Sequence, residues 1–266
     1  MSDAELSELP ESHPRYLSLR TRHRIEEGVE KGITSKQGLI AEGRGEAFDY
    51  LLGERTLPTA DDAARAAAAH LLLARHPVIS VNGNVAALVP EDVVELAAVV
   101  DADVEVNLFN RTDERMQAIV DHLREHGAGE VKGLNGDARI PGLDHKRAVV
   151  DADGIGDADV VLVPLEDGDR AEALAAVGKT EIVVDLNPLS RSAQTATVPI
   201  VDNIVRALPN ITTHARDLAG RPREELEAVV ETFDTAGALA EAESAIRGGR
   251  LESDAESDPR TNGERK

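Results

Sequence analysis

Four short apolar segments between residues 78 and 186 place the strongest limit on how this chain can fold. They are VISVNG (78–83), VEVNLF (104–109), VVLVP (160–164) and IVVDL (182–186). Each is rich in Val, Ile or Leu without strict alternation, which is typical of parallel strands that are covered on both faces. Amphipathic helical patterns separate them, with predicted helix starts at Pro90, near Thr112 and after Asp167. The spacing therefore predicts an α/β fold with a Rossmann-like, mostly parallel sheet.

Helical patterns precede and follow this alternating region. Residues 17–76 predict three helices, with breaks near Gly32 and at residues 56–58, and residues 202–246 predict two helices separated by Gly220 and Pro222. No linker divides the middle of the chain. We therefore expect one α/β domain over residues 13–250, with extra helices at both ends and flexible, charged tails at 1–12 and 251–266.

Charge and composition limit the classes of partner and chemistry. The 266 residues carry a formal net charge of -21, and arginines outnumber lysines by 23 to 6. Such an acidic, lysine-poor surface is typical of proteins adapted to concentrated salt, and it disfavours binding to nucleic acid. The chain has no cysteine, which excludes thiolate catalysis. No apolar run reaches the roughly 18 residues of a membrane span, so we expect a cytoplasmic protein without membrane contact.

Polar groups follow all four predicted strands. They are Asn82-Gly83-Asn84, Asn107 with Asn110-Arg111, Glu166 to Arg170, and Asp185 to Asn187. The carboxyl ends of parallel strands meet at one edge, where open α/β sheets bind ligands, so the four groups are expected to face one site. Two of the groups, taken singly, have a simpler interpretation. Asn-Gly-Asn is also a common turn sequence, and the acidic run after the third strand could simply cap the next helix.

Neither common nucleotide motif is present. The chain has no G-x-x-x-x-G-K-[ST] and no G-x-G-x-x-G after a strand, which argues against a nicotinamide-dependent oxidoreductase. A nucleotide would instead be held by arginine forks and by polar groups at strand ends. Arg191 and Ser192 suit phosphate, whereas Asp185 and Asn187 suit hydroxyl or amide groups.

Two further motifs allow more than one interpretation. Arg44 lies between two glycines in a helical stretch, which predicts either a packing notch between helices or a close approach to an anion. His122-Leu-Arg-Glu125-His126 matches an inverted zinc-peptidase pattern, but it lies in a charged helix, and we interpret the histidines as part of a solvated face. No residue is predicted as a metal ligand.

Several long blocks resemble one known family, the archaeal 4-phosphopantoate–β-alanine ligases, also called phosphopantothenate synthetases. The blocks are HPRYLSL, GLIAEGRGEAFDYLLGE, PVISVNGNVAALVP, ARIPGLDH, ADVVLVPLEDGDR and DLNPLSRSA with IVDNIVRALPN. The resemblance implies a Rossmann-like homodimer that uses Mg-ATP to join 4-phosphopantoate to β-alanine. The products would be 4'-phosphopantothenate, AMP and pyrophosphate, formed through a phosphopantoyl adenylate, in coenzyme A biosynthesis.

The resemblance also implies a set of site residues. The implied nucleotide contacts are Arg22, Arg44, Asp185, Leu186, Asn187, Arg191, Ser192, Asn203 and Ile204. Among them, Arg22, Arg44 and Arg191 are candidates for stabilising the charge that develops on the phosphoryl oxygens, together with Mg²⁺. We further hypothesise that Asn82, Gly83 and Asn84 hold phosphopantoate. The main alternative is a nucleotide-binding regulatory protein without turnover.

Overall fold

The computed structural model describes residues 10, 12–13, 15–165 and 167–248. The predicted tails at 1–12 and 251–266 fall outside the described residues, apart from Pro10 and Ser12, and so does Glu166. No helix in the described ranges is both long and apolar enough to cross a membrane.

Five parallel strands form the central sheet, in the spatial order β2-β1-β5-β6-β7. They are β1 (Pro77–Val81), β2 (Asp103–Val106), β5 (Val160–Pro164), β6 (Thr180–Asp185) and β7 (Val198–Val201). Counted along the chain within this sheet, the order is 2-1-3-4-5, as in flavodoxin-like folds. The predicted parallel sheet is confirmed.

The fifth strand, β7, was not predicted. It is four residues long and contains Pro199, which has no N–H to donate to a sheet. Proline is tolerated in a strand that pairs on one side only, and among the described strands β7 pairs only with β6, where Pro199 lies opposite Val183.

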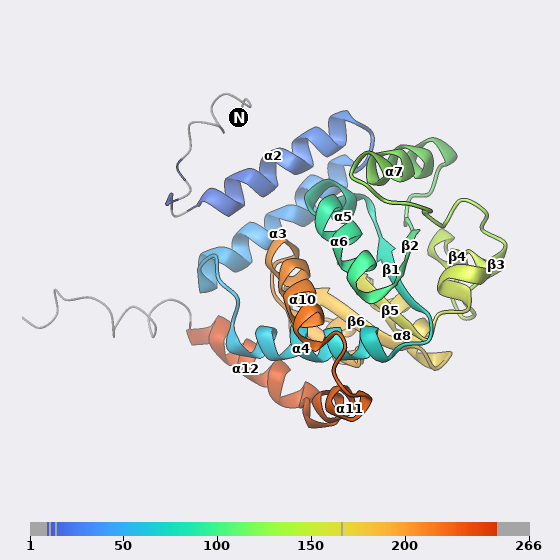
Figure 1. The fold of residues 1–266 in the computed structure, drawn as a ribbon. Helices are drawn as coiled ribbons and strands as arrows, with labels where there is room; N and C mark the ends of the chain where they lie inside the picture. The colour runs from blue at the N-terminus through green and yellow to red at the C-terminus, as the bar shows by residue number, and fades with distance from the viewer. Residues whose placement is uncertain (1–9, 11, 14, 166, 249–266) are drawn as a thin grey trace, which may run out of the picture.

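Helices cover both faces of the sheet, which explains why its strands do not alternate between apolar and polar residues. Ile79 and Leu162 belong to one core, and Val78 and Val161 to another on the opposite face. The first core is shared with α4 (Pro58–Leu73), α5 (Gly83–Leu88), α6 (Pro90–Val100), α7 (Asp113–Glu125) and α10 (Ile204–Leu218). Figure 1 shows α6 and α10 in front of the strands.

Smaller elements cover the second face. Leu174 of α8 (Gly168–Ala176) packs there, as do residues of a short antiparallel pair. These elements are β3 (Ala138–Arg139), β4 (Val149–Val150) and the single turns η1 (Lys146–Ala148) and η2 (Ala152–Gly156). The five-residue helix α9 (Arg191–Thr195) packs beside α8.

The predicted helical additions are found at both ends of the chain (Figure 1). The first three helices are confirmed as α2 (Tyr16–Glu30), α3 (Lys36–Leu52) and α4. The final region holds three helices instead of the predicted two, because α11 (Arg223–Thr232) and α12 (Thr235–Gly248) follow α10. The unpredicted break lies at Asp234, whose carboxylate accepts a hydrogen bond from the N–H of Gly237 at 3.0 Å.

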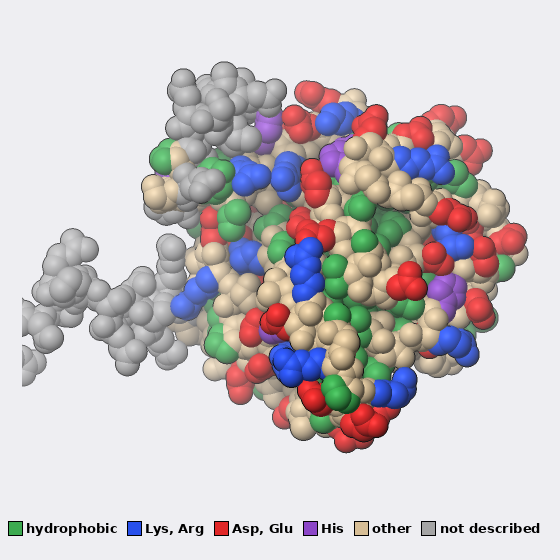
Figure 2. Space-filling model, viewed as in Figure 1, with side chains coloured by type: hydrophobic (Ala, Val, Ile, Leu, Met, Phe, Trp, Pro, Cys, Tyr) green, Lys and Arg blue, Asp and Glu red, His purple; other side chains and the backbone are tan. Residues whose placement is uncertain are grey.

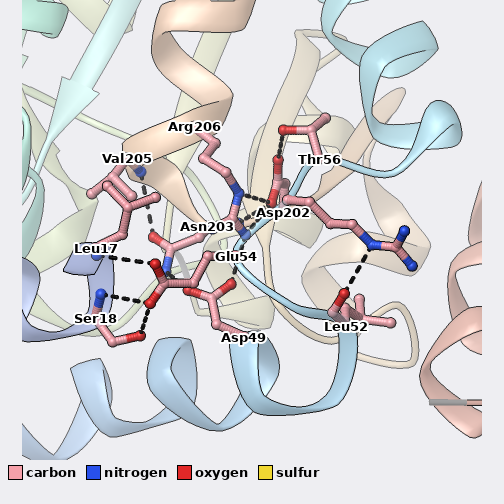
Figure 3. A network of polar contacts seen from close by, with 11 residues as sticks. Leu17, Ser18, Asp49, Leu52, Glu54, Thr56, Asp202, Asn203, Val205 and Arg206 are labelled. Carbon is pink, nitrogen blue, oxygen red and sulfur yellow. Dashed lines mark hydrogen bonds and ion pairs between the residues drawn. The ribbon is translucent and has the colours of Figure 1, made fainter. Parts of the chain in front are cut away.

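Glu54 fixes the start of α2 against the end of α3. Its carboxylate accepts hydrogen bonds from the backbone N–H groups of Leu17 and Ser18, both at 3.0 Å, and from the Ser18 hydroxyl at 2.6 Å (Figure 3). A carboxylate at a helix N-terminus satisfies N–H groups that have no partner inside the helix. This contact holds the two N-terminal helices together.

Candidate functional site

A cavity of about 290 Å³ lies at the carboxyl ends of the strands. Its walls come from the segments that follow all five strands and from the region around the start of α3. The chain passes from β1 to β2 on one side and returns to β5 on the other, so the cavity lies where the strand order reverses. Ligands of open α/β sheets bind at such a switch point. The structure thus places the predicted strand ends, represented by Asn82, Asn110, Asp167 and Leu186, around one space.

Seven of the predicted site residues line this cavity. They are Arg44, Asn82, Gly83, Asn84, Leu186, Asn203 and Ile204. The other five, Arg22, Asp185, Asn187, Arg191 and Ser192, lie outside its lining.

Asn82 ties two strands together at the switch point. Its side-chain oxygen accepts hydrogen bonds from the N–H groups of Asn84 and Val85 at 3.0 and 3.1 Å, and its amide donates to the carbonyls of Pro164 and Leu165 at 3.0 and 3.3 Å. These contacts cap α5 and join the ends of β1 and β5. Asn82 therefore shapes the cavity through bonds within the protein.

The side chain of Asn84 is also hydrogen-bonded within the protein. Its side-chain oxygen accepts from the Thr34 hydroxyl at 2.5 Å, and its amide donates to the carbonyl of Gly38 at 3.1 Å. A Cβ at Gly38 would lie 2.2 Å from the Thr34 oxygen and 2.3 Å from the Asn84 oxygen, which explains the glycine there. The assignment of this loop to substrate stays a prediction, and the structure adds that both amide side chains are already bonded.

Three arginines surround the cavity, two of which sequence reasoning missed. Arg44 was predicted, and the structure adds Arg115 of α7 and Arg147 of η1. Arg44 and Arg115 form no ion pair with any carboxylate of the described ranges. Arg115 instead donates to the backbone carbonyls of Ile33 at 3.1 Å and Asn110 at 3.3 Å. Figure 2 shows how widely acidic side chains are spread over the visible surface, so this concentration of positive charge is local.

Arg147 is held in place by charge and burial. It is 7% exposed, and its Nε lies 3.7 Å from a carboxylate oxygen of Asp167. Burial, together with the neighbouring cation Arg170, lowers the pKa of Arg147 to about 10, which leaves it charged at neutral pH. Arg170 is fully buried behind it and donates to the Ser80 hydroxyl at 3.1 Å.

A buried ionic network holds the start of α10 at the cavity (Figure 3). Arg206 donates to Asp49 of α3 at 2.7 Å and to Asp202 at 2.6 Å. Asp49 also accepts from the side-chain amide of Asn203 at 3.2 Å, and Asp202 from the Thr56 hydroxyl at 2.6 Å. The network joins α3 to the end of β7, and so fixes two residues of the cavity wall, Asn203 and Ile204.

The glycines around Arg44 have different surroundings. A Cβ at Gly45 would lie 3.0 Å from a carboxylate oxygen of Glu42 and 3.2 Å from the amide nitrogen of Asn203, whereas a Cβ at Gly43 would meet no atom within 4 Å. Gly45 therefore allows a close approach between α3 and the start of α10. The packing interpretation therefore holds for Gly45, whereas the approach of Arg44, which lines the cavity, to an anion stays a prediction.

The predicted arginines outside the cavity lining already have acidic partners. Arg22 contacts both carboxylate oxygens of Glu46, at 2.7 and 2.6 Å. Arg191 is exposed and pairs with Asp169 and, at 3.5 Å, with Glu172. Either arginine would have to exchange a carboxylate for a phosphate to bind a nucleotide.

Asp185, Asn187 and Ser192 build the segment that leads from β6 into α9. Asp185 accepts from the N–H of Asn187 at 3.1 Å and from the Ser190 hydroxyl at 2.5 Å, and Asn187 accepts from the N–H of Leu189 at 3.0 Å. Ser192 is 2% exposed. These contacts shape the turn that carries Leu186 to the cavity.

The described residues contain no group of three or more His, Asp or Glu side chains that could hold a metal ion. The H-x-x-E-H histidines contact each other edge to face, with ring centroids 4.3 Å apart. His122 is 8% exposed, so the prediction of a solvated position was wrong for this residue, which packs on the buried face of α7.

Fold and cavity together define an open, parallel α/β protein with an arginine-lined cavity at its switch point. A family-level sequence profile for phosphopantothenate/pantothenate synthetases matches residues 59–249. The chain belongs to this family.

Individual relatives extend the similarity over most of the chain. A 4-phosphopantoate–β-alanine ligase from Thermococcus kodakarensis is 57% identical over 240 residues, which cover 90% of this chain and 92% of the relative. The ligase of the same name from Methanosarcina mazei is 54% identical over 91% of this chain and 95% of the relative. That from Methanospirillum hungatei is 51% identical over 90% and 96%.

Proposed function

We propose that the chain is a 4-phosphopantoate–β-alanine ligase that consumes ATP and releases AMP and pyrophosphate, acting in the cytoplasm in coenzyme A biosynthesis. The names of relatives at 51–57% identity support the condensation itself. A ligase of this family uses a nucleotide as co-substrate. The structural observation that carries the proposal is the cavity lined by Arg44, Arg115 and Arg147 in a protein of net charge -21.

The residue types around the cavity suit the chemistry of acid activation. A carboxylate is a poor acyl donor, so that of 4-phosphopantoate would first attack the α-phosphorus of ATP, giving a phosphopantoyl adenylate and pyrophosphate. Negative charge develops on the phosphoryl oxygens in this step, and fixed cations stabilise it best where water is excluded. Arg44 is the predicted arginine best placed for this role, since it lines the cavity and forms no ion pair within the described ranges.

Nucleotide binding is proposed along the wall formed by the end of β6 and the start of α10. Leu186, Asn203 and Ile204 line the cavity there. Asp185, Asn187, Arg191 and Ser192 come from the adjoining segment, and Arg22 from α2. Mg²⁺ would arrive on the phosphates and neutralise part of their charge.

A homodimer is proposed as the working form. Four apolar side chains of α3 are exposed in the single chain: Leu39, Ile40, Tyr50 and Leu51, with Ile40 at 78%. Exposed apolar side chains gathered on one element are typical of a surface that another chain covers. This helix also carries Arg44 and Glu42, so such an interface would lie close to the cavity.

The proposal is tested by measuring AMP and pyrophosphate in molar KCl with Mg-ATP, adding 4-phosphopantoate and β-alanine singly and together. AMP and the condensed product should form only when both are present. Pyrophosphate exchange into ATP with 4-phosphopantoate alone would support the adenylate. A folded, ATP-binding protein without turnover would overturn the proposal in favour of a regulatory nucleotide-binding protein.

A further inference from the structure

Glu42 is an acidic residue in a cavity that is also lined by three arginines. Two carboxylates of the described residues line this space, Glu42 and Asp167. Asp167 lies within ion-pair distance of Arg147, but Glu42 forms no ion pair with any cation of the described ranges. A carboxylate that lines the same cavity as three arginines without pairing to them is available for a cationic group brought by a ligand.

The position of Glu42 is fixed by its surroundings. It lies on α3 with one oxygen 3.0 Å from the point where a Cβ on Gly45 would sit, and the side-chain nitrogen of Asn203 lies 3.2 Å from the same point. The Thr21 hydroxyl of α2, which donates to the Ser18 carbonyl at 3.0 Å, lies beside the carboxyl group. Glu42 therefore lies on the wall between α3 and the start of α10, the wall proposed for the nucleotide.

The charges around Glu42 favour its protonated form. Burial has the largest effect, and the neighbouring carboxylates Asp49 and Glu46 of α3 act in the same direction. The neighbouring Thr21 hydroxyl and the charge of Arg44 oppose them, and the resulting pKa is raised to about 7. On the α2 side Arg22 lines the same small hollow as Glu42, and on the α10 side Asn203 is uncharged. A carboxyl group with a pKa near the working pH suits a general base.

The proposed reaction needs such a group. The amine of β-alanine arrives as an ammonium ion, because alkyl amines have a pKa of roughly 10. An ammonium has no lone pair, so it must lose a proton before it can attack an acyl carbon. The arginines around the cavity cannot accept that proton, since guanidinium groups remain protonated.

We propose that Glu42 binds the ammonium group of β-alanine and accepts its proton, as the general base of the amide-forming step. The inference rests on the proposed ligase function. One N–H proton passes to the Glu42 carboxylate, and the freed lone pair forms the C–N bond to the acyl carbon. The bond between that carbon and the AMP oxygen then breaks, and its electron pair leaves with AMP. The second proton lost by nitrogen passes to the departing phosphate.

The test compares the wild-type enzyme with Glu42→Gln in two half-reactions. Pyrophosphate exchange into ATP that depends on 4-phosphopantoate reports the first step and should stay within about twofold of wild type. kcat/KM for β-alanine should fall by about a hundredfold, within the usual contribution of a general base. Hydroxylamine, which is uncharged at neutral pH, should capture the acyl group equally well with both enzymes.

The pH profile adds a readout that a structural role would not change. In wild type, kcat/KM for β-alanine should rise with pH and level off above the Glu42 pKa of about 7. In Glu42→Gln it should keep rising toward the amine pKa of roughly 10. Glu181→Gln is the matched control, since burial raises the pKa of Glu181 to about 7 as well but Glu181 does not line the cavity, and this variant should keep the wild-type profile.

The outcomes separate the inference from the proposed function. Equal β-alanine kinetics in wild type and Glu42→Gln, with exchange intact in both, would overturn the role of Glu42 alone. Absence of exchange and of product in wild type would overturn the ligase. If Glu42→Gln does not fold, a wild-type profile that keeps rising above about pH 7 would by itself refute the base.

Discussion

Arg115 lies directly over Gly83, such that a Cβ on this glycine would come within 2.5 Å of the arginine Nη2. The same Cβ would lie 2.5 Å from the Ile33 carbonyl oxygen, which belongs to the backbone and cannot move aside as a side chain can. The first loop of the sheet and a cavity arginine are thus packed against each other.

Replacing Gly83 with Ala should displace Arg115 and strain the backbone at Ile33. We expect the KM for 4-phosphopantoate to rise by about tenfold and the free energy of unfolding to fall by about 1–3 kcal/mol, as for other overpacked sites. Steady-state kinetics and urea unfolding measure the two effects. Gly43→Ala is the control, because a Cβ there meets no atom within 4 Å, and it should stabilise the protein by about 0.4–1 kcal/mol. Unchanged kinetics in Gly83→Ala would argue against a role for Arg115.

Arg115→Lys should weaken the binding of the anionic substrate although charge is kept. Lysine cannot reproduce the planar fork that reaches the Ile33 and Asn110 carbonyls and the cavity together. We expect kcat/KM for 4-phosphopantoate to fall by about ten- to a hundredfold, since a hydrogen bond to a charged group contributes about 1.5–3 kcal/mol. Arg216→Lys, on an exposed pair with Glu95, should leave this value unchanged.

Removal of Arg206 should destabilise the protein more than removal of a surface arginine. Arg206→Ala would leave Asp49 and Asp202, which are 4% and 1% exposed, without their shared cation. Breaking a buried pair in this way costs about 3–5 kcal/mol. Arg223→Ala breaks an exposed pair of similar length with Glu227 and should cost less than about 1 kcal/mol. Similar urea midpoints for the two variants would contradict this reading of the network.

The stability of the protein should fall as pH rises toward neutrality because of Glu181. Burial raises its pKa to about 7, with Arg170 opposing the shift, and neither side-chain oxygen has a hydrogen-bond partner among the described residues. The folded state therefore holds this proton at pH values where the unfolded chain has lost it, so stability decreases across the interval between the two pKa values. Glu181→Gln should reduce that decrease by at most about 3 kcal/mol. A pH dependence identical to wild type would show that Glu181 does not titrate in this range.

Salt should stabilise the protein. Arginine and lysine together number 29 against 50 acidic residues, and acidic side chains are spread over the visible face in Figure 2. Repulsion among exposed charges is screened beyond about 3 Å in 1 M salt. We expect the thermal midpoint to rise steeply from low salt to molar KCl and then more slowly. A midpoint that falls over this range would contradict adaptation to concentrated salt.

Much of the fold could be predicted from the spacing of apolar residues. Buried parallel strands are short apolar runs, and amphipathic helices repeat apolar residues every three to four positions. β7 was missed since it is short and contains Pro199, a residue that signals a turn more often than a strand. The helix break at Asp234 was missed for a related reason, because no Gly or Pro marks it and the capping carboxylate alone is a weak signal.

The cavity could be predicted only in part, because its residues come from segments far apart in the chain. The strand-end asparagines were visible as polar groups after apolar runs. Arg115 and Arg147 could not be recognised as cavity residues from the sequence. Each is several residues away from the end of a predicted strand, and the path of the chain between strands decides whether such a residue reaches the cavity. The one available signal was their position in segments that connect predicted strands. Glu42 gave no signal at all, because an acidic residue in a charged helix is ordinary until its neighbours are known.

Pro199 also limits pairing at the edge of the sheet. An exposed strand edge offers unpaired N–H and C=O groups to other chains, and edge-to-edge pairing of this kind starts aggregation. The outer edge of β7 has one donor fewer because of the proline, and α12 packs against the strand. In concentrated salt, where charge repulsion between molecules is screened, such a blocked edge keeps neighbouring copies from joining their sheets.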